Sequence, residues 1–189
     1  VVGGNVSLYN EHGKGAIDPT PVISMVGLIE KAERVTRSFV EQSGQSIILL
    51  GGLPNELGGS YFLQTKYGKK EGTCPEVDFS EEKKIQDFLI HSIDSGLVEA
   101  AHDLAEGGLL VAVSEMLFEK PNLGIDLSVD SLGSSNRLDA LLFGESQGRV
   151  LISVSDDKLD QLMVLAGEKS LPTLVLGSIN ESGRLKFSL

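Results

Sequence analysis

Residues 173–189 have the sequence TLVLGSINESGRLKFSL, and this stretch decides which kind of sheet the chain forms. Apolar residues dominate 173–179 and alternate with polar ones over 184–189, as is typical of β-strands. The turn formers Glu181, Ser182 and Gly183 lie between the two segments, so the sequence predicts a closing hairpin. Two consecutive strands without an intervening helix favour a mixed sheet over a purely parallel, doubly wound one.

The rest of the chain alternates between apolar runs and amphipathic segments. Turn formers bound the expected strands, which are at 22–29, 46–50, 97–101, 123–129 and 149–154. Apolar residues recur at helical spacing in the longer of the expected helices, which are at 56–67, 81–94, 105–119, 137–143 and 156–168. Ser80 is the expected N-cap of the second of these helices. The pattern predicts an α+β fold in which helices cover a layered, mixed β-sheet.

The composition excludes several classes of protein. The chain has 189 residues, a net charge of −11 and a pI of about 4.7, and its length suits one domain with a fragment of a second. The single cysteine, Cys74, excludes an internal disulfide and a CxxC metal site. No apolar run approaches the roughly 20 residues that span a bilayer, and no signal peptide is visible. Nucleic-acid binding needs a basic face, so the net negative charge argues against a nucleic-acid partner. Together with the lack of a membrane-spanning run and of a signal peptide, this leads us to expect a cytoplasmic protein without a membrane partner.

Gly3, Gly4, Asn5 and Ser7 form the first candidate site. Paired glycines let backbone N–H groups approach a phosphate closely, and an asparagine oxygen is a hard ligand that suits Mg²⁺. In an extended chain the Ser7 hydroxyl lies on the same face as the Asn5 side chain. The alternative is a glycine turn that leads into a strand, because Gly, Asn and Ser are frequent in turns.

The second candidate site lies at 102–109, where an expected strand leads into an expected helix. Open sheets place ligands at such strand ends, so Asp103 could bind a metal and the helix start at Gly107 and Gly108 could receive a phosphate. The alternative is a tight turn in which Asp103 caps the helix and the glycines allow close packing. His102 is expected to be structural.

The third candidate site is the loop 144–149, GESQGR. Glu145, Ser146, Gln147 and Arg149 offer a carboxylate, a hydroxyl, an amide and a guanidinium, a combination that can bind a polar ligand. The alternative is a helix end at Gly144 followed by a solvated turn. Neither a P-loop nor a GxGxxG motif is present, and the three histidines lack the spacing of a zinc site.

Four motifs occur in the order in which a known family has them: VGGNVSLYNE at 2–11, PTPVI at 19–23, AHDLAEGGL at 101–109 and FGESQGR at 143–149. On these motifs essentially the whole chain resembles the C-terminal half of the phosphoribosylformylglycinamidine synthase (PurL) family of purine biosynthesis. The first motif is specific within its superfamily, whereas the last two recur in related forms across PurM-like proteins. The resemblance implies that residues 1–20 end a PurM N-terminal-like domain and its linker, and that 21–189 form a PurM C-terminal-like domain. The start in mid-motif, without Met, suggests a piece of a longer polypeptide.

The resemblance also implies a ligase reaction that depends on ATP and Mg²⁺. The family converts formylglycinamide ribonucleotide, ATP and glutamine-derived ammonia into formylglycinamidine ribonucleotide, ADP and phosphate, and its partners are a glutaminase subunit or domain and a small accessory subunit. By the family pattern, Gly4 lies at the ATP, Asn5 binds Mg²⁺ and Ser7 contacts the ribonucleotide. The family's catalytic histidine, its lysine at the ATP and most of its metal carboxylates lie upstream of these motifs. We therefore assign no catalytic residue here and expect the isolated chain to be inactive.

The remaining motif residues belong to the second, pseudo-equivalent half of the family's architecture. By resemblance they serve an auxiliary nucleotide or nothing; they are Asp103, Gly107, Gly108, Glu145, Ser146 and Gln147. Two other interpretations stay open: a non-catalytic scaffold or auxiliary nucleotide-binding domain, and the C-terminal domain of another PurM-like ATP-dependent enzyme. The run NVSLYNE at 5–11 argues against the second of these.

Overall fold

A computed structural model of the chain describes residues 1–128 and 137–188. Two compact units divide the chain, Val1–Ala32 and Glu33–Leu189. The boundary that the resemblance places after residue 20 stays a prediction. Val129 and Leu189, the expected ends of two strands, lie outside the described residues.

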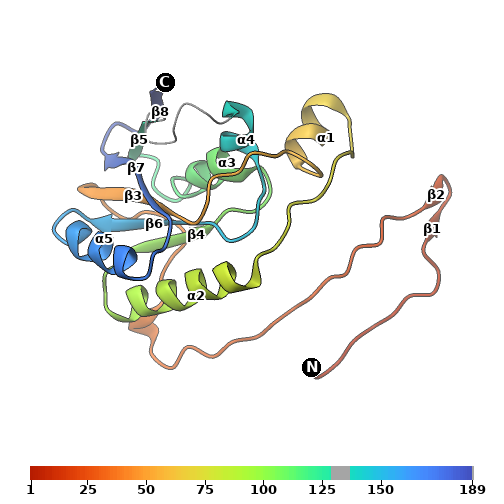
Figure 1. Cartoon of the computed structure of the whole chain (residues 1–189), viewed down its shortest axis with the longest axis horizontal. Helices are drawn as coiled ribbons and strands as arrows, with labels where there is room; N and C mark the ends of the chain where they lie inside the picture. Colours follow the sequence, from red (N-terminus) through yellow and green to blue (C-terminus); the bar gives the residue numbers. More distant parts are fainter. Residues whose placement is uncertain (129–136, 189) are drawn as a thin grey trace. The chain divides into compact units, whose positions relative to one another are not determined.

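The first unit is an extended segment with one short hairpin (Figure 1). Strands β1 (Glu11–His12) and β2 (Gly15–Ala16) pair antiparallel. The strand expected at 22–29 is not formed, and its side chains are exposed. A strand is held by hydrogen bonds to a neighbour, and no strand in the described part of the chain pairs with this segment. A short 3₁₀ helix, η1 (Ala32–Arg34), follows.

The second unit is built on a six-stranded mixed sheet, as the sequence predicted (Figure 1). Its strands, in the order in which they lie side by side, are β4 (Ala100–Asp103), β6 (Val150–Ser155), β3 (Gln45–Leu50), β7 (Thr173–Asn180), β5 (Gly124–Ser128) and β8 (Leu185–Ser188). Neighbouring strands are antiparallel except β5 and β8, which are parallel. Strand β3 is central, and all six of its residues are buried.

The expected hairpin of the last two strands is wrong, because β5 lies between β7 and β8. The connection from Asn180 to Leu185 instead passes over the start of β5 at Gly124. A Cβ atom at Gly124 would lie 2.3 Å from Ser182 Oγ and 2.5 Å from the Arg184 carbonyl oxygen. The Ile125 amide also donates to that carbonyl at 3.0 Å. The missing side chain of Gly124 therefore makes room for the crossing, which the local turn residues alone could not predict.

Helices cover both faces of the sheet (Figure 1). Side chains alternate along β3, so Ile47 and Leu49 pack in one cluster with the apolar residues of α3 and α4. Ile48 and Leu50 pack in a second cluster with those of α2 and α5. The four helices are α2 (Phe79–Asp94), α3 (Gly108–Glu115), α4 (Leu138–Phe143) and α5 (Leu159–Glu168). The expected α+β fold with helices layered on a mixed sheet is confirmed.

Helix α2 begins two residues earlier than the sequence predicted, because Asp78 and not Ser80 is its N-cap. Asp78 Oδ1 accepts hydrogen bonds from the amides of Ser80 at 2.9 Å and Glu81 at 3.1 Å. The Ser80 hydroxyl donates to the same oxygen at 2.7 Å. Asp and Ser are both good N-caps. Asp78 is the N-cap of α2 because its carboxylate accepts three hydrogen bonds at the positive end of the helix.

The Asp78→Ala variant is expected to lower the unfolding midpoint at pH 7 by about 2–4 °C. The hydrogen bond from the Ser80 side chain, and then those from the Glu81 and Ser80 amides, lower the pKa of Asp78. Since the unfolded-state pKa is about 3.9, the stabilisation is present above that pH and is lost as the pH falls through the folded-state pKa. Thermal unfolding of both proteins between pH 7 and pH 2 measures this difference. The matched variant Ser80→Ala removes one of the three bonds and is expected to cost less; a difference that grows on acidification would contradict the assignment.

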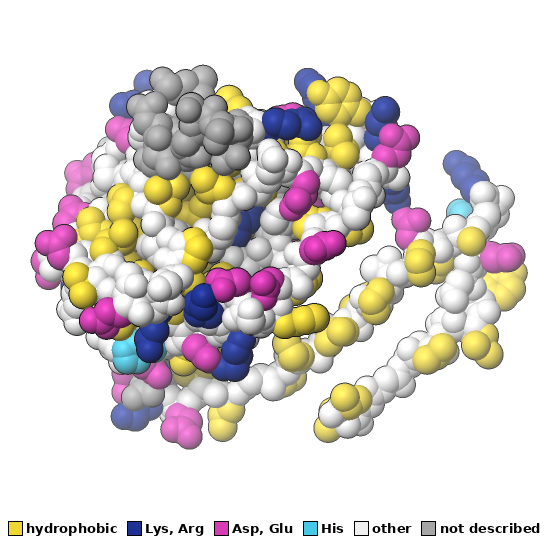
Figure 2. Space-filling view, in the orientation of Figure 1, with side chains coloured by type: hydrophobic (Ala, Val, Ile, Leu, Met, Phe, Trp, Pro, Cys, Tyr) yellow, Lys and Arg dark blue, Asp and Glu magenta, His cyan; other side chains and the backbone are white. Residues whose placement is uncertain are grey.

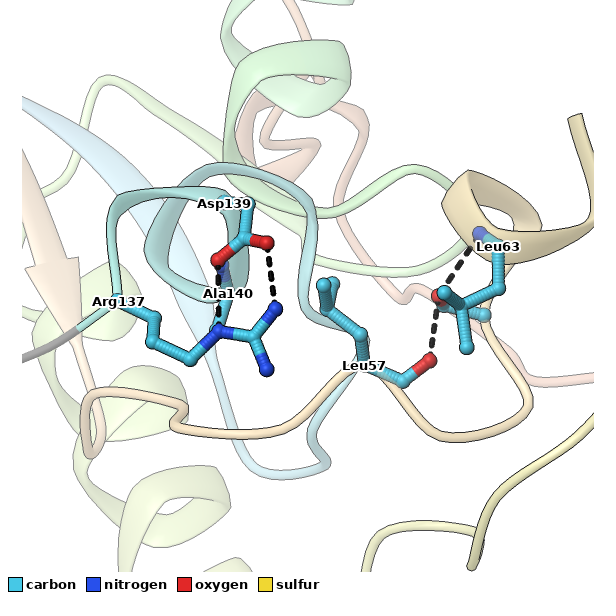
Figure 3. A network of polar contacts seen from close by, with 6 residues as sticks. Leu57, Leu63, Arg137, Asp139 and Ala140 are labelled. Carbon is cyan, nitrogen blue, oxygen red and sulfur yellow. Dashed lines mark hydrogen bonds and ion pairs between the residues drawn. The ribbon is translucent and has the colours of Figure 1, made fainter. Parts of the chain in front are cut away.

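Helix α1 (Tyr61–Tyr67) is shorter than the expected helix over 56–67. Gly59 has a φ of 70°, outside the helical region, so the helix begins only after it. The Ser60 hydroxyl accepts from the Leu63 amide at 3.4 Å and donates to the Leu57 carbonyl at 2.6 Å (Figure 3). This N-cap sets where α1 begins, and the Tyr61 amide at that position donates to Glu145 of the loop 144–149.

Helix α4 begins one residue later than the sequence predicted, next to an ion pair between Arg137 and Asp139 (Figure 3). The Arg137 guanidinium donates to both carboxylate oxygens, at 3.0 Å and 2.6 Å. Asp139 Oδ1 also accepts from the Ala140 amide at 2.9 Å. The bond from Arg137 first, and the Ala140 amide after it, hold the pKa of Asp139 below its usual range. The start of α4 thus carries a carboxylate, the charge that suits a helix N-terminus.

Candidate functional site

The end of β4, the loop 144–149 and helix α2 enclose a cavity of about 440 Å³. Ile85 and Leu89 of α2 give it an apolar side. Polar groups of both charges line the rest, from Glu82, Gln86, Asp103, Glu106, Glu145, Gln147 and Arg149. A cavity with an apolar side and a few convergent polar groups can hold and orient a small polar ligand.

The structure brings together three of the six residues predicted for a second site, namely Asp103, Glu145 and Gln147. The other three, Gly107, Gly108 and Ser146, are not part of the cavity lining. The expected strand over 97–101 is displaced along the chain to Ala100–Asp103. Asp103 therefore ends β4, and its side chain is 81% exposed.

Glu145 joins the starts of two helices. Its Oε1 atom accepts hydrogen bonds from the amide of Tyr61, the first residue of α1, and from the amide of Gly107, the N-cap of α3, both at 2.9 Å. Helix N-terminal amides lack acceptors within the helix, and a negative charge there is stabilising. The carboxylate of Glu145 is thus already engaged in positioning α1 and α3.

Arg149 is 4% exposed and fixes the shape of the same loop. Its Nε donates to the Ser146 carbonyl at 3.0 Å and its Nη2 to the Gly144 carbonyl at 2.6 Å. Burial lowers the pKa of the Arg149 guanidinium to about 10, against the effect of the nearby carboxylates of Glu56 and Glu145. The side chain therefore keeps its charge at neutral pH. Its Nη1 has no hydrogen-bond partner within the described residues.

The glycine pair before α3 allows close packing. Gly107 and Gly108 have φ values of 83° and 68°, which glycine adopts without strain; this left-handed stretch explains why α3 begins at 108 and not at 105. A Cβ atom at Gly108 would lie 2.5 Å from the Gly144 carbonyl oxygen and 2.8 Å from the Phe143 carbonyl carbon. The Ser146 hydroxyl likewise donates within the protein, to Glu56. These contacts support the close packing that the alternative predicted. Its helix cap is wrong, because Gly107 and not Asp103 is the N-cap of α3.

His102 has the structural environment that was expected of it. Its Nε2 lies 3.2 Å from Glu115 Oε2 on α3, and its Nδ1 lies 2.7 Å from the Asp103 carbonyl oxygen. The side chain is 15% exposed. The pairing with Glu115 links β4 to α3, and only the packing of the helix against the sheet brings the two side chains together.

Gly4, Asn5 and Ser7 lie in the first unit, and all three are exposed. The Asn5 side-chain amide lies 3.5 Å from the Ser7 hydroxyl and donates to it, so the Asn5 carbonyl oxygen takes no part in that bond. The Asn10 side chain donates to the Ser7 carbonyl at 3.0 Å. A Cβ atom at Gly4 would meet nothing within 4 Å, so the backbone there is open to a ligand.

Two features are absent from residues 1–128 and 137–188. No three His, Cys, Asp or Glu side chains in these ranges are grouped so that they could hold a metal ion. No helix in the same ranges has the length and hydrophobicity to cross a membrane. The Asn5 side chain offers one hard oxygen. A single such ligand is compatible with Mg²⁺, which binds through few protein ligands together with phosphates.

Sequence reasoning missed the contribution of α2 to the cavity. Glu82 and Gln86 both line the cavity, and the helical spacing of α2 alone singles out neither residue. Arg149 was identified as part of the polar loop, but its burial was not predicted. A signal for the burial exists, because Arg149 directly precedes the apolar strand β6.

Comparison with known proteins assigns the chain to a family. The family described as AIR synthase related protein, C-terminal domain, matches residues 42–189. The subunit PurL of phosphoribosylformylglycinamidine synthase from Symbiobacterium thermophilum is 42% identical over 190 residues, which cover 100% of this chain and 24% of the relative. PurL from Moorella thermoacetica is 40% identical over 196 residues, covering 100% of this chain and 26% of the relative. The chain thus spans about a quarter of the length of these relatives.

Solved structures of Thermotoga maritima PurL have the same fold. PurL complexed with FGAR superposes with a TM-score of 0.67 at 26% identity, covering 79% of this chain and 26% of that chain. PurL complexed with ATP superposes with a TM-score of 0.62 at 25% identity, covering 79% of this chain and 24% of that chain. The PurLQS structure superposes with a TM-score of 0.61 at 27% identity, covering 80% of this chain and 24% of that chain. From the family match, the relatives and the shared fold together, the chain belongs to the AIR synthase related family, whose C-terminal domain it contains.

Proposed function

We propose that this chain is part of an ATP-dependent ligase of purine biosynthesis. The enzyme would convert formylglycinamide ribonucleotide, ATP and glutamine-derived ammonia into formylglycinamidine ribonucleotide, ADP and phosphate. The observation that carries the proposal is the 42% identity to PurL over the whole chain, which includes the motif at 2–11. The T. maritima relative was solved in complex with both ATP and FGAR.

The motif at the start of the chain would supply the contacts of this chain to the reactants. Gly4 would present its backbone to the ATP phosphates, since no side chain and no neighbour obstructs it. The Asn5 carbonyl oxygen would hold Mg²⁺, and the Ser7 hydroxyl would bind the ribonucleotide. Mg²⁺, when bound, neutralises charge on the transferring phosphoryl group. The exposure of all three residues supports this assignment.

The second candidate function is a scaffold that holds at most an auxiliary nucleotide. It would use the six residues predicted for a second site, Asp103, Gly107, Gly108, Glu145, Ser146 and Gln147. The bonds of Glu145 to α1 and α3, and of Ser146 to Glu56, favour the scaffold over a nucleotide site, because they engage these groups within the protein. The C-terminal domain of another PurM-like ATP-dependent enzyme is a further alternative, which the motif at 2–11 disfavours.

The partners and the location follow from the same proposal. We propose a glutaminase subunit or domain that delivers ammonia, a small accessory subunit, and a cytoplasmic location. The T. maritima PurLQS structure is an assembly in which a PurL relative of similar fold takes part.

The Asn5→Ala variant of the full-length enzyme tests the assignment of the ligase activity. We expect ammonia-dependent ADP formation to fall by at least about 100-fold, because an interaction that stabilises phosphoryl charge in the transition state is lost. Circular dichroism and the unfolding midpoint should stay unchanged, since Asn5 is exposed. The matched variant Asn122→Ala removes an exposed asparagine between α3 and β5 and should keep full activity. Loss of subunit assembly with normal nucleotide affinity would instead favour the scaffold.

The 189-residue chain alone is expected to form no ADP from ATP, ammonia and the ribonucleotide, because the residues that the family uses for catalysis lie upstream. A calorimetric titration with ATP and Mg²⁺, on the chain and on its Asn5→Ala variant, locates any binding. Binding lost in the variant would place a nucleotide at the first motif. Binding retained in the variant would place it at Asp103 and Glu145, and ammonia-dependent turnover by this chain would refute the prediction.

A further inference from the structure

Asn10 connects the first candidate site to the short hairpin of the first unit (Figure 1). Its side-chain amide donates to the Ser7 carbonyl oxygen at 3.0 Å. Its own backbone carbonyl accepts from the Ile17 amide at 3.0 Å, directly beside the pairs that β1 and β2 form. The backbone of Asn10 is thus held by the hairpin, while its side chain holds the motif that precedes the hairpin.

The first unit has no hydrophobic core that could hold this motif in place. None of residues 1–32 is buried, and Figure 2 shows side chains projecting from the extended chain along its length. In a protein core, close packing fixes the directions of side chains. Here local hydrogen bonds take over that task, because an asparagine side chain that bonds a nearby backbone group defines the conformation between them.

The bond from Asn10 sets the direction of the Ser7 hydroxyl. Each residue has only two soft backbone dihedrals, so fixing the Ser7 carbonyl fixes how the Ser7 side chain points relative to the hairpin. The Ser7 hydroxyl also accepts from the Asn5 side-chain amide at 3.5 Å, which leaves its own hydrogen available to a ligand. The three side chains therefore form a series of contacts from the hairpin to the groups that would meet the reactants.

We propose that Asn10 is a positioning residue of the ligase site, which holds Ser7 in the orientation that binds the ribonucleotide. The proposal rests on the proposed ligase function and gives a role to a residue that does not itself touch a reactant. Asparagine suits this role because its amide donates to a carbonyl, whereas an ionised aspartate of nearly the same shape only accepts. The contact of Gly4 to ATP is three residues away from the bond and depends on it less.

Steady-state kinetics of the full-length enzyme test this role. We expect Asn10→Ala to raise the KM for the ribonucleotide about 10-fold, with kcat and the KM for ATP within about 2-fold of the parent enzyme. Asn10→Asp removes the donor at nearly constant size and should match Asn10→Ala, whereas Asn10→Gln keeps a donor and should lie between them and the parent. Lys14→Ala, at the exposed turn of the same hairpin, is the control and should change none of these constants.

A double-mutant cycle with Ser7→Ala separates positioning from a direct contact. If Asn10 acts through Ser7, adding Asn10→Ala to Ser7→Ala leaves the KM for the ribonucleotide at the value of Ser7→Ala alone. Effects that multiply would show that Asn10 acts independently of Ser7 and would overturn the proposal. A raised KM in Ser7→Ala, with the parent value in the Asn10 variants, would overturn the positioning role and leave the ligase assignment intact. An unchanged KM in Ser7→Ala would refute the assignment of Ser7 and the positioning role with it.

Discussion

The Gly51→Ala variant is expected to lose about 3–5 kcal/mol of its free energy of unfolding. Gly51 follows β3 with a φ of 101°, a conformation that alanine adopts only with strain. A Cβ atom there would lie 2.1 Å from the Gly148 carbonyl oxygen. The Gly51 amide also donates to the Pro172 carbonyl at 2.8 Å, so the backbone cannot move away without breaking that bond. The contact lies beside the cavity, and the loop 144–149 would be displaced as well.

The neighbouring glycine provides the control. Gly52 has an ordinary φ, and a Cβ atom there would meet nothing within 4 Å. Gly52→Ala is therefore expected to change the free energy of unfolding by less than about 0.5 kcal/mol. Urea unfolding of the two variants and the parent protein measures both effects. Equal stabilities of the two variants would mean that the close approach of Gly51 to Gly148 does not constrain the fold.

The Glu145→Ala variant is expected to lose about 2–4 kcal/mol, because two helix N-terminal amides lose a charged acceptor at once. The amides belong to Tyr61 and Gly107. The buried Arg149 also loses one of the two carboxylates, Glu56 and Glu145, that favour its charged form. We expect α1 to loosen first, since none of its residues is buried. Urea unfolding gives the total loss, and hydrogen exchange of the α1 amides gives its local part.

Two further variants separate the charge of Glu145 from its geometry. Glu145→Gln keeps an oxygen that can accept both bonds but removes the charge, so an intermediate loss is expected. Glu106→Ala removes an exposed carboxylate from the same cavity lining and should cost less than about 0.5 kcal/mol. A loss in Glu106→Ala as large as that in Glu145→Ala would show that the charge of the cavity, and not the two helix caps, controls stability.

Local sequence patterns predicted the elements of the second unit well and their pairing poorly. The aliphatic run at 46–50 predicted a buried strand, because it is short, apolar at successive positions and followed by glycine and proline. The hairpin of the last two strands was wrong, because β5 inserts between them and lies about 50 residues earlier in the chain. The same limit applies to residues 22–29, whose apolar pattern predicted a strand that pairs with no other strand in the described residues.

The candidate site shows what spacing in the sequence leaves open. The motif GESQGR was identified as polar and capable of binding, and the loop does line a cavity. Which of its groups face that cavity depends on residues far away in the sequence. The amides of Tyr61 and Gly107 donate hydrogen bonds to the Glu145 carboxylate. The Ser146 hydroxyl donates one to the Glu56 carboxylate. Motif spacing reports the chemistry that is present, whereas the fold decides how much of it stays available to a ligand.

The central position of β3 has a consequence for biosynthesis. Ile48 pairs with Ile152 and Val175, so the most hydrophobic strand of the sheet leaves the ribosome well before either neighbour. At a translation rate of about 5–20 residues per second, β3 stays without β6, the first of its partner strands to be made, for on the order of 5–20 seconds. During that interval an aggregation-prone segment is unprotected. Slower translation between β3 and β6 is therefore expected to reduce the soluble yield, because it prolongs the time for which this strand is unpaired.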